Sequence, residues 1–246
     1  MEPVISEQPR LSTALAVFLN ISLTYGILWL KLFLINQRQA ADMVLLKNIP
    51  IEFSNKDVLR YLGFKPLKSS NSPTIDKLLE ETIDLAKLVL TPLAVFETLV
   101  LEEINPEKLT FVGSNFFLRG KDIVNFMSSC SKVSLVAATI GAGIEEEISR
   151  LFKAQDSSRA VILDAIGSDA VEQVVSWVNT LVQQEARKQG FNTLHRVSPG
   201  YSLWSIEANG AIAQALDVKK IGIEVLPSYE MLPRKSVMAA VGWVGK

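Results

Sequence analysis

The chain has 246 residues, 48% of them apolar, and its 25 basic and 26 acidic side chains leave a formal net charge of −1. This length suits one large domain with a small addition, and the balanced charge gives no bulk attraction to nucleic acid or anionic lipid. Cys130 and His195 are the only residues of their types. They exclude an internal disulfide and most zinc sites, and they disfavour a Cys–His nucleophile pair. We therefore expect a reduced, intracellular protein with no nucleic-acid partner, no metal site and no hydrolase centre.

The first 42 residues differ from the rest of the chain. Residues 11–35 are apolar except for a few polar side chains and Lys31, and about 20 such residues can span a bilayer as a helix. Lys31 and Arg38 lie on the C-terminal flank, which predicts that the following domain faces the cytoplasm. However, Met43 opens a sequence typical of the start of a soluble protein. Three interpretations stay open for residues 1–42: a membrane anchor, a translation start set too early, or a buried core helix.

Two helices are predicted next, and they form a small helical segment over residues 43–95. The first covers residues 54–62, beginning at Ser54. The second has Ser72 as a plausible N-cap and Pro73 in its first turn, and it stops before Thr91-Pro92. Its acidic residues lie early and its leucines form one apolar face, as expected of a helix packed on a core.

Residues 96–246 alternate between strand and helix patterns without a linker or an internal repeat. Asn105-Pro106 is a turn signal between two strand-like segments, which predicts a hairpin. The interpretation for this region is an α+β domain with a mixed or antiparallel twisted sheet and flanking helices. Strands are expected over 94–104, 108–113, 132–140, 192–197, 221–226 and 236–243, and helices over 121–130, 158–188 and 203–216.

A glycine turn follows the predicted strand over 132–140. Gly141-Ala142-Gly143 and the helix after it are similar to the GxGxxG fingerprint of dinucleotide-binding proteins, but the third glycine is replaced by Glu146. Glu146 and its two neighbouring glutamates would favour the helix dipole themselves and would repel a pyrophosphate. The segment therefore indicates a tight turn with an acidic helix start.

The most informative segment is RVSPGY, residues 196–201. Arg196 carries a permanent positive charge and a planar set of donors suited to a carboxylate. Pro199 and Gly200 favour a turn that lets backbone approach a ligand, and Tyr201 offers an aromatic face and a hydroxyl. Together they could hold the amino-acid end of a small zwitterion. Taken alone, the same residues also fit a surface arginine beside a turn.

RVSPGY resembles the RxxPGY motif in the activation domain of vitamin B12-dependent (cobalamin-dependent) methionine synthase. Three further segments resemble that family in the same order: the strand and glycine turn VSLVAATIGAGIEEEI, the long helix AVILDAIGSDAVEQV, and the C-terminal stretch IGIEVLPSYEMLPRKSV. The resemblance covers residues 97–242 and is greatest to the stand-alone form of the domain.

The resemblance implies a binding site for S-adenosylmethionine. Arg196 would bind the ligand carboxylate, Pro199, Gly200 and Tyr201 would form the turn beside it, and Glu172 would be the acidic residue on the long helix near the ligand. The resemblance implies no catalytic residue and no metal ligand in this chain. One departure is that the aromatic pair expected after the Ser-Val strand is absent, since residues 238–241 are Met-Ala-Ala-Val. We expect His195 to face away from the site, because neighbours in an extended segment point to opposite sides.

The implied function is reactivation of a corrinoid in methionine biosynthesis. The chain would be a component of a methyltransferase system, with the cobalamin carried by a methionine synthase subunit or another corrinoid protein and with electrons supplied by a donor protein. Its location would be cytoplasmic, anchored to the membrane only if residues 11–35 form a span. Two alternatives remain: an accessory subunit that binds a corrinoid protein without using S-adenosylmethionine, and a membrane-tethered small-molecule sensor.

Overall fold

The structure, a computed structural model, describes residues 43–63, 73–201 and 204–245. The predictions for residues 1–42 and for Ser72 lie outside these ranges. In chain order the elements are β1 (Val44–Lys47), α2 (Asn55–Tyr61), α3 (Pro73–Val89), β2 (Leu93–Ile104), β3 (Lys108–Phe111), β4 (Phe117–Arg119), α4 (Lys121–Met127), β5 (Cys130–Thr139), α5 (Gly143–Lys153), α6 (Ser157–Lys188), β6 (Phe191–Thr193), α7 (Ala208–Leu216), the 3-10 helix η1 (Val218–Ile221), β7 (Glu224–Val225), β8 (Met231–Leu232) and β9 (Ser236–Gly245).

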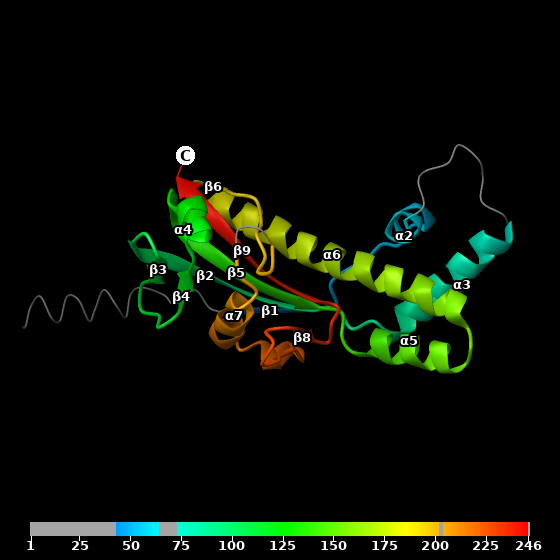
Figure 1. The fold of residues 1–246 in the computed structure, drawn as a ribbon. Coiled ribbons are helices and arrows are strands. Elements are labelled where there is room, and N and C mark those ends of the chain that lie inside the picture. The colour runs from blue at the N-terminus through cyan, green and yellow to red at the C-terminus, as the bar shows by residue number, and fades with distance from the viewer. Residues whose placement is uncertain (1–42, 64–72, 202–203, 246) are drawn as a thin grey trace, which may run out of the picture. The chain divides into compact units, whose positions relative to one another are not determined.

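The described residues form a seven-stranded sheet in the order β4-β3-β2-β5-β9-β6, with β1 also paired to β2. Every pairing in it is antiparallel. The longest ladder joins β5 to β9, from Cys130 opposite Val244 to Thr139 opposite Ser236. This arrangement, drawn in Figure 1, confirms the predicted α+β class with an antiparallel sheet. The short strands β7 and β8 form a separate two-stranded sheet.

Several elements differ from their predicted lengths. The segment over residues 43–95 is not only helical, because β1 pairs with the beginning of β2. The strand expected over 192–197 ends as β6 at Thr193, and the helix expected over 203–216 begins as α7 at Ala208. Within 221–226, only Glu224 and Val225 form a strand. The strands β1, β4 and β8 were not predicted.

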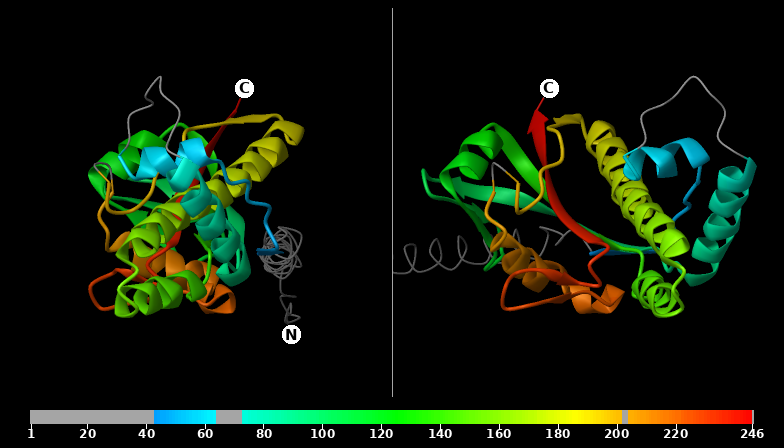
Figure 2. Two further views of the ribbon diagram at one scale, coloured as in Figure 1. Left: turned by 90° about the vertical axis from the view of Figure 1, so that its right-hand side faces the viewer. Right: turned by 45° about the vertical axis from the view of Figure 1, so that its right-hand side comes forward.

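Helices cover both faces of the sheet, and each face has its own core. The first core contains residues of α2, α3, α5 and α6 with the side chains Ala94, Val136 and Val241. The second contains residues of β3, β4, α4, α7 and η1 with Val95, Leu135 and Ala240. Neighbouring strand residues therefore enter opposite cores, as the pleat requires. Both views in Figure 2 show α6 running along one side of the sheet.

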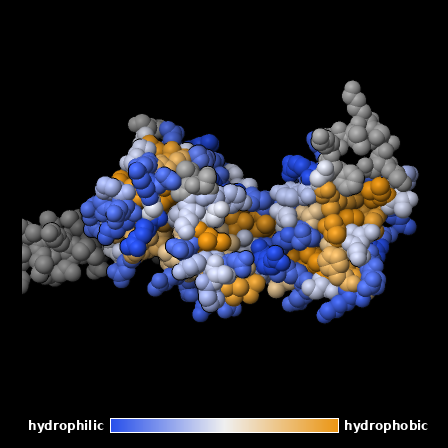
Figure 3. Space-filling model, in the orientation of Figure 1, coloured by the Kyte–Doolittle hydropathy of each residue, from blue (hydrophilic) through white to orange (hydrophobic). Residues whose placement is uncertain are grey.

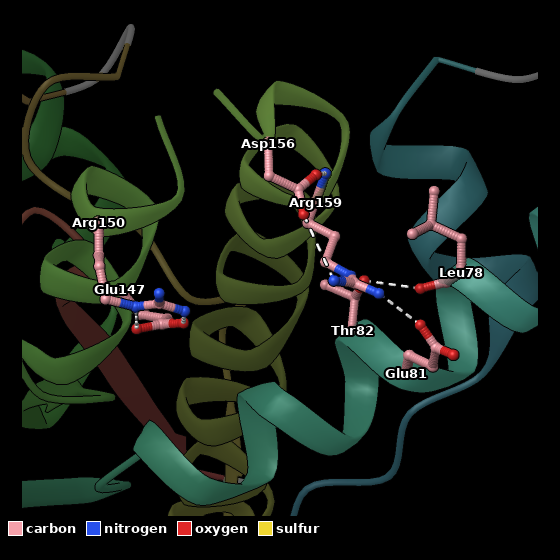
Figure 4. A network of polar contacts seen from close by, with 7 residues as sticks. All are labelled: Leu78, Glu81, Thr82, Glu147, Arg150, Asp156 and Arg159. Atoms are coloured by element: carbon pink, nitrogen blue, oxygen red, sulfur yellow. Dashed lines mark hydrogen bonds and ion pairs between the residues drawn. The ribbon is translucent and has the colours of Figure 1, made fainter. Parts of the chain in front are cut away.

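The helix α6 spans 32 residues and begins with a capped end. The Asp156 carboxylate accepts a hydrogen bond from the Arg159 backbone N–H at 3.2 Å, which satisfies a donor that the first turn leaves free. The Arg159 guanidinium also contacts Asp156 and reaches Glu81 of α3. Figure 4 shows this contact between α3 and α6, and a separate pair, Glu147 with Arg150, on α5.

The glycine turn after β5 is a packing feature. A Cβ at Gly143 would lie 2.6 Å from the Val89 carbonyl oxygen, so α5 begins where only glycine fits beside the end of α3. The Glu145 carboxylate accepts a hydrogen bond from the Lys235 backbone N–H at 2.9 Å. The dinucleotide fold needs a parallel βαβ unit, whereas β5 pairs antiparallel with both of its neighbours. The structure therefore agrees with a tight turn.

Within the described ranges, no helix combines the length and the apolar character needed to cross a bilayer. The span predicted over residues 11–35 lies outside those ranges. Figure 3 shows apolar surface over the region of α3, α5 and the start of α6. Exposed large apolar side chains in these helices are Ile75, Leu88, Phe152 and Val161.

Candidate functional site: a cleft around Arg196

A cleft of about 610 Å³ lies where the chain after β6 meets α6, α7 and the start of β9. We call it the Arg196 cleft. Its lining combines two charged side chains with small polar and apolar ones. The lining residues are Glu172, His195, Arg196, Val197, Ser198, Pro199, Tyr201, Asn209, Met231, Ser236, Val237 and Met238.

The pairing with β9 places Arg196. After β6, the Leu194 N–H donates to the Gly242 carbonyl at 2.9 Å, and Val197 exchanges two backbone hydrogen bonds with Ala240, at 3.0 and 2.8 Å. The chain thus stays beside β9 past the last residue of β6. Val197 is buried at 8% exposure, and Arg196 next to it reaches α6.

The turn predicted at Pro199-Gly200 is present. Gly200 has a φ of 87°, a left-handed conformation that favours glycine. Its N–H donates to the Trp204 carbonyl at 2.9 Å, and the Trp204 N–H donates to the Tyr201 carbonyl at 2.8 Å. These bonds fold the segment back toward α7, so residues on either side of Gly200 border the cleft.

The Arg196 guanidinium donates a hydrogen bond from one terminal nitrogen, while the other has no partner among the described residues. Nη2 donates to Glu172 Oε2 at 2.9 Å, with the Arg196 and Glu172 side chains 23% and 41% exposed. Nη1 is buried and has no hydrogen-bond partner in the described part of the chain. Because a buried donor without a partner is costly, this nitrogen is suited to an anionic or carbonyl oxygen of a ligand. A carboxylate would match the planar guanidinium best.

Asn209 supplies a second unused polar atom at the cleft. Its Nδ2 donates to the Tyr229 carbonyl at 3.0 Å, whereas its Oδ1 is buried with no partner among the described residues. Sequence reasoning missed this residue, although a signal was present. Asn209, Ile212 and Leu216 are spaced as one face of α7 and are all buried, so an amide stands on the apolar stripe of that helix.

The structure brings together most of the residues that the sequence singled out. Arg196, Glu172, Pro199 and Tyr201 border one cleft, although Glu172 is 24 positions from Arg196 in the chain. Tyr201 is 74% exposed, so most of its ring faces solvent. Gly200 shapes the turn without bordering the cleft itself.

His195 is closer to the site than predicted. Its ring packs against Phe126 of α4, with 4.5 Å between ring centroids, whereas Arg196 bonds to α6. The two side chains therefore contact different helices, as expected for neighbours in extended backbone. His195 nevertheless also borders the cleft, so it lies closer to Arg196's surroundings than the alternation alone indicates.

The start of β9 forms another wall of the cleft. Lys235 fixes this point, because its Nζ donates to Ser168 Oγ at 2.8 Å and lies 2.8 Å from Asp164 Oδ1 of α6. Ser236 is buried, and its Oγ donates to Thr139 Oγ1 at 2.9 Å. Val237 and Met238 border the cleft. This wall therefore presents the methyl groups of Val237 and the thioether of Met238, and Met238 belongs to the stretch, residues 238–241, where the resemblance predicts an aromatic pair.

Comparison with protein-family models gives no match for this sequence, and the search of curated proteins gives none either. A match comes from the solved structures. The fold is similar to that in a crystal structure described as the MetH reactivation domain bound to AdoHcy, with a TM-score of 0.60 and 12% sequence identity. The match covers 83% of this chain and 79% of that chain. The chain thus shares the fold of the reactivation domain, a mixed α and β structure with a curved antiparallel sheet flanked by helices.

Proposed function

We propose that the Arg196 cleft binds S-adenosylmethionine and that the chain supports reductive methylation of a corrinoid carried by a partner protein. The observation that carries this proposal is the Arg196 guanidinium, fixed by Glu172 and left with a buried, unpaired Nη1 at the cleft. The similarity to a reactivation domain that binds AdoHcy supports an S-adenosylmethionine-type ligand at the level of the fold.

The chemistry of the lining fits that ligand. The ligand carboxylate would accept hydrogen bonds from two N–H groups of the Arg196 guanidinium. The ligand ammonium would form an ion pair with the Glu172 carboxylate, which lies 2.9 Å from the same guanidinium. The apolar Val237 and Met238 offer contact for the methylene chain and the nucleoside of the ligand. A cleft of about 610 Å³ is also within the usual range of about 300–1,000 Å³ for small-molecule sites.

The proposed reaction explains why the cleft needs no catalytic base. When the corrinoid is bound to its partner and reduced, its cobalt is a nucleophile that can take the methyl group from the sulfonium, and no proton has to be removed by a side chain. The protein then contributes binding, orientation and exclusion of competing reactions. In this proposal the partner is a cobalamin-binding methionine synthase subunit or another corrinoid protein, and a separate protein donates the electrons.

Titration calorimetry with S-adenosylmethionine and S-adenosylhomocysteine tests the site. We expect Arg196→Ala to weaken binding about 10- to 100-fold, the usual loss for a charged hydrogen bond of about 1.5–3 kcal/mol. Arg196→Lys should recover only part of the affinity, because an ammonium cannot reproduce the planar pair of donors.

Arg150→Ala is the matched control, because Arg150 pairs with Glu147 on α5 and does not border the cleft. It should bind like the wild type. Equal affinities for Arg196→Ala and the wild type would overturn the assignment of the site.

Dependence on a partner is tested by activity. The isolated protein should form no methionine from S-adenosylmethionine and homocysteine. With a cobalamin-loaded partner and a one-electron donor, it should support formation of methylcobalamin, which absorption spectra follow directly. Arg196→Ala should remove that support and Arg150→Ala should keep it. Methionine formation by the isolated chain would show that it has a catalytic centre of its own.

A second candidate function follows from residues 238–241, which lack the aromatic pair that the resemblance implies and of which Met238 borders the cleft. Without the aromatic pair, the chain could be an accessory subunit that binds a corrinoid protein and does not use S-adenosylmethionine. This alternative is favoured if the wild type binds the cobalamin-loaded partner but shows no heat of binding with either S-adenosyl ligand.

A further inference from the structure

We propose that Asn209 is a specificity-determining residue, whose Oδ1 accepts a hydrogen bond from an uncharged N–H or O–H donor on the nucleoside part of the ligand. This inference rests on the proposed function of the Arg196 cleft. It assigns a role to a residue of α7, the helix that reaches the cleft from the face of the sheet opposite α6.

The orientation of the Asn209 amide is determined by its surroundings. The Nδ2 group donates to the Tyr229 carbonyl at 3.0 Å. Exchanging the two ends of the amide would place its oxygen against that carbonyl oxygen, where neither atom could donate. The amide oxygen is therefore the atom left over, and its only use is to accept a hydrogen bond.

This oxygen is an unused acceptor in an almost fully buried side chain. Asn209 is 3% exposed, and its Oδ1 has no partner in the described ranges. Buried amide oxygens normally have a partner, because leaving one without a hydrogen bond is unfavourable. A ligand reaches this atom after a lining side chain moves aside. We infer that the side chain that moves is Met231, which is flexible and half-buried and borders the same cleft.

The positions of the charged residues indicate which end of the ligand binds in which part of the cleft. Arg196 and Glu172 are the charged residues that border it, apart from the titratable His195, and they form an ion pair with each other. They suit the carboxylate and ammonium of an amino acid. Asn209 is neutral and desolvated, so it suits an uncharged donor such as the adenine amino group or a ribose hydroxyl.

The experiment uses S-adenosylhomocysteine and analogues that each lack one donor. Three analogues change the nucleoside: inosine in place of adenosine, 2′-deoxyribose, and 3′-deoxyribose. A fourth lacks the α-ammonium. Calorimetry on the full chain gives the loss of affinity for each analogue relative to S-adenosylhomocysteine. We expect at least one nucleoside analogue to bind the wild type about tenfold more weakly, the usual effect of one hydrogen bond.

Two variants separate the roles of the two ends of the amide. Asn209→Ala lacks the acceptor, so the loss for that nucleoside analogue should disappear, while the loss for the analogue without the ammonium should remain. Asn209→Asp keeps an oxygen in place of Oδ1 and replaces Nδ2 with a second oxygen, which can donate to the Tyr229 carbonyl only in the protonated carboxylic acid, so calorimetry on this variant is run below about pH 5 as well as at neutral pH. In the protonated form the variant keeps the acceptor at the Oδ1 position. It should therefore still discriminate against the same analogue. Thermal unfolding shows whether either variant has lost its fold, and Asn209→Asp supplies the test if Asn209→Ala has.

The outcomes distinguish this inference from the proposed function. If the wild type binds no S-adenosyl ligand, the proposed function fails and this inference with it. If the wild type binds but Asn209→Ala keeps every loss unchanged, or Asn209→Asp discriminates no better than Asn209→Ala, only the inference is wrong. It is also wrong if the loss that disappears is that of the analogue lacking the ammonium, because the donor would then be charged.

Discussion

At the scale of single residues, the glycine with the least room for a side chain is Gly242 of β9, which lies beside α4 and the start of β5. A Cβ at position 242 would overlap the Cys130 sulfur, and it would lie 2.7 Å from Met127 Sδ. Burial raises the pKa of Cys130 to about 11, so this thiol stays protonated and packs as a small apolar group. The close approach of β9 to its neighbours thus depends on the absence of a side chain at 242.

Gly242→Ala should destabilise the protein by about 1–3 kcal/mol, the usual effect of overpacking a core. Gly245→Ala is the control, because a Cβ there meets nothing within 4 Å. Thermal or denaturant unfolding measures both. Adding Cys130→Ala should recover part of the loss, because it removes one of the overlapping atoms. A Gly242→Ala protein as stable as the wild type would show that the strand has room to move.

At the scale of elements, a buried carboxylate connects α6 to α2, because Asp169 Oδ1 lies 3.6 Å from Arg60 Nη2 of α2. Asp169 is 4% exposed and accepts a hydrogen bond from Gln173 Nε2 at 2.7 Å. Burial raises the pKa of Asp169, while the bond from Gln173 lowers it, the nearby Asp57 raises it and Arg60 lowers it. The net shift is upward, so the folded protein holds this proton more tightly than the unfolded chain does.

Asp169→Asn should therefore change how stability depends on pH. As pH rises from about 4, the unfolded chain loses this proton before the folded protein does, so the wild type loses stability through this window. The variant lacks that loss, so it should gain stability relative to the wild type as pH rises above about 4. Asp84→Asn, an exposed change on α3, is the control. Urea unfolding at several pH values gives the comparison, and a difference that does not vary with pH would contradict the expectation.

The sequence predicted the long elements well because their apolar residues repeat clearly. The helices α3 and α6 and the strands β2, β5 and β9 were expected within a few residues of their observed bounds. By contrast, β1 and β4 are only four and three residues long. Such strands are too short for an alternation of apolar and polar residues to be recognised in the sequence. Their strand conformation depends on pairing with β2 and β3, which the local sequence does not specify.

The candidate site was predicted only in part, for a similar reason. RVSPGY marked Arg196 and its turn, and the resemblance marked Glu172. The ion pair between Arg196 and Glu172 is a contact between segments separated in the chain, and no local pattern shows such a contact. Asn209 could have been found from its position on the apolar face of α7, whereas Met231 carries no signal that would set it apart from other core residues.

At the scale of the whole molecule, the described residues belong to one compact unit with two cores. The strand β1 begins at Val44, directly after Met43, and pairs with β2. A protein that starts at Met43 should therefore remain soluble and unfold cooperatively. Size-exclusion chromatography and thermal unfolding check this. An aggregated or molten product would show that residues 1–42 contribute to the core.

Two parts of the cleft lining, Tyr201 and Ser236, stand at the two ends of a long segment of the chain. Between Tyr201 and Ser236 the chain forms α7, η1, β7 and β8, and the described residues of this stretch that border the cleft are Asn209 of α7 and Met231 of β8. A ligand that contacts residues at both ends of this segment therefore connects its start to its end. Because such a ligand binds only when both ends are in place, its binding free energy opposes local opening of α7 and the β7–β8 hairpin. Occupancy of the cleft should thus slow amide hydrogen exchange in η1 and β7, which do not border the cleft.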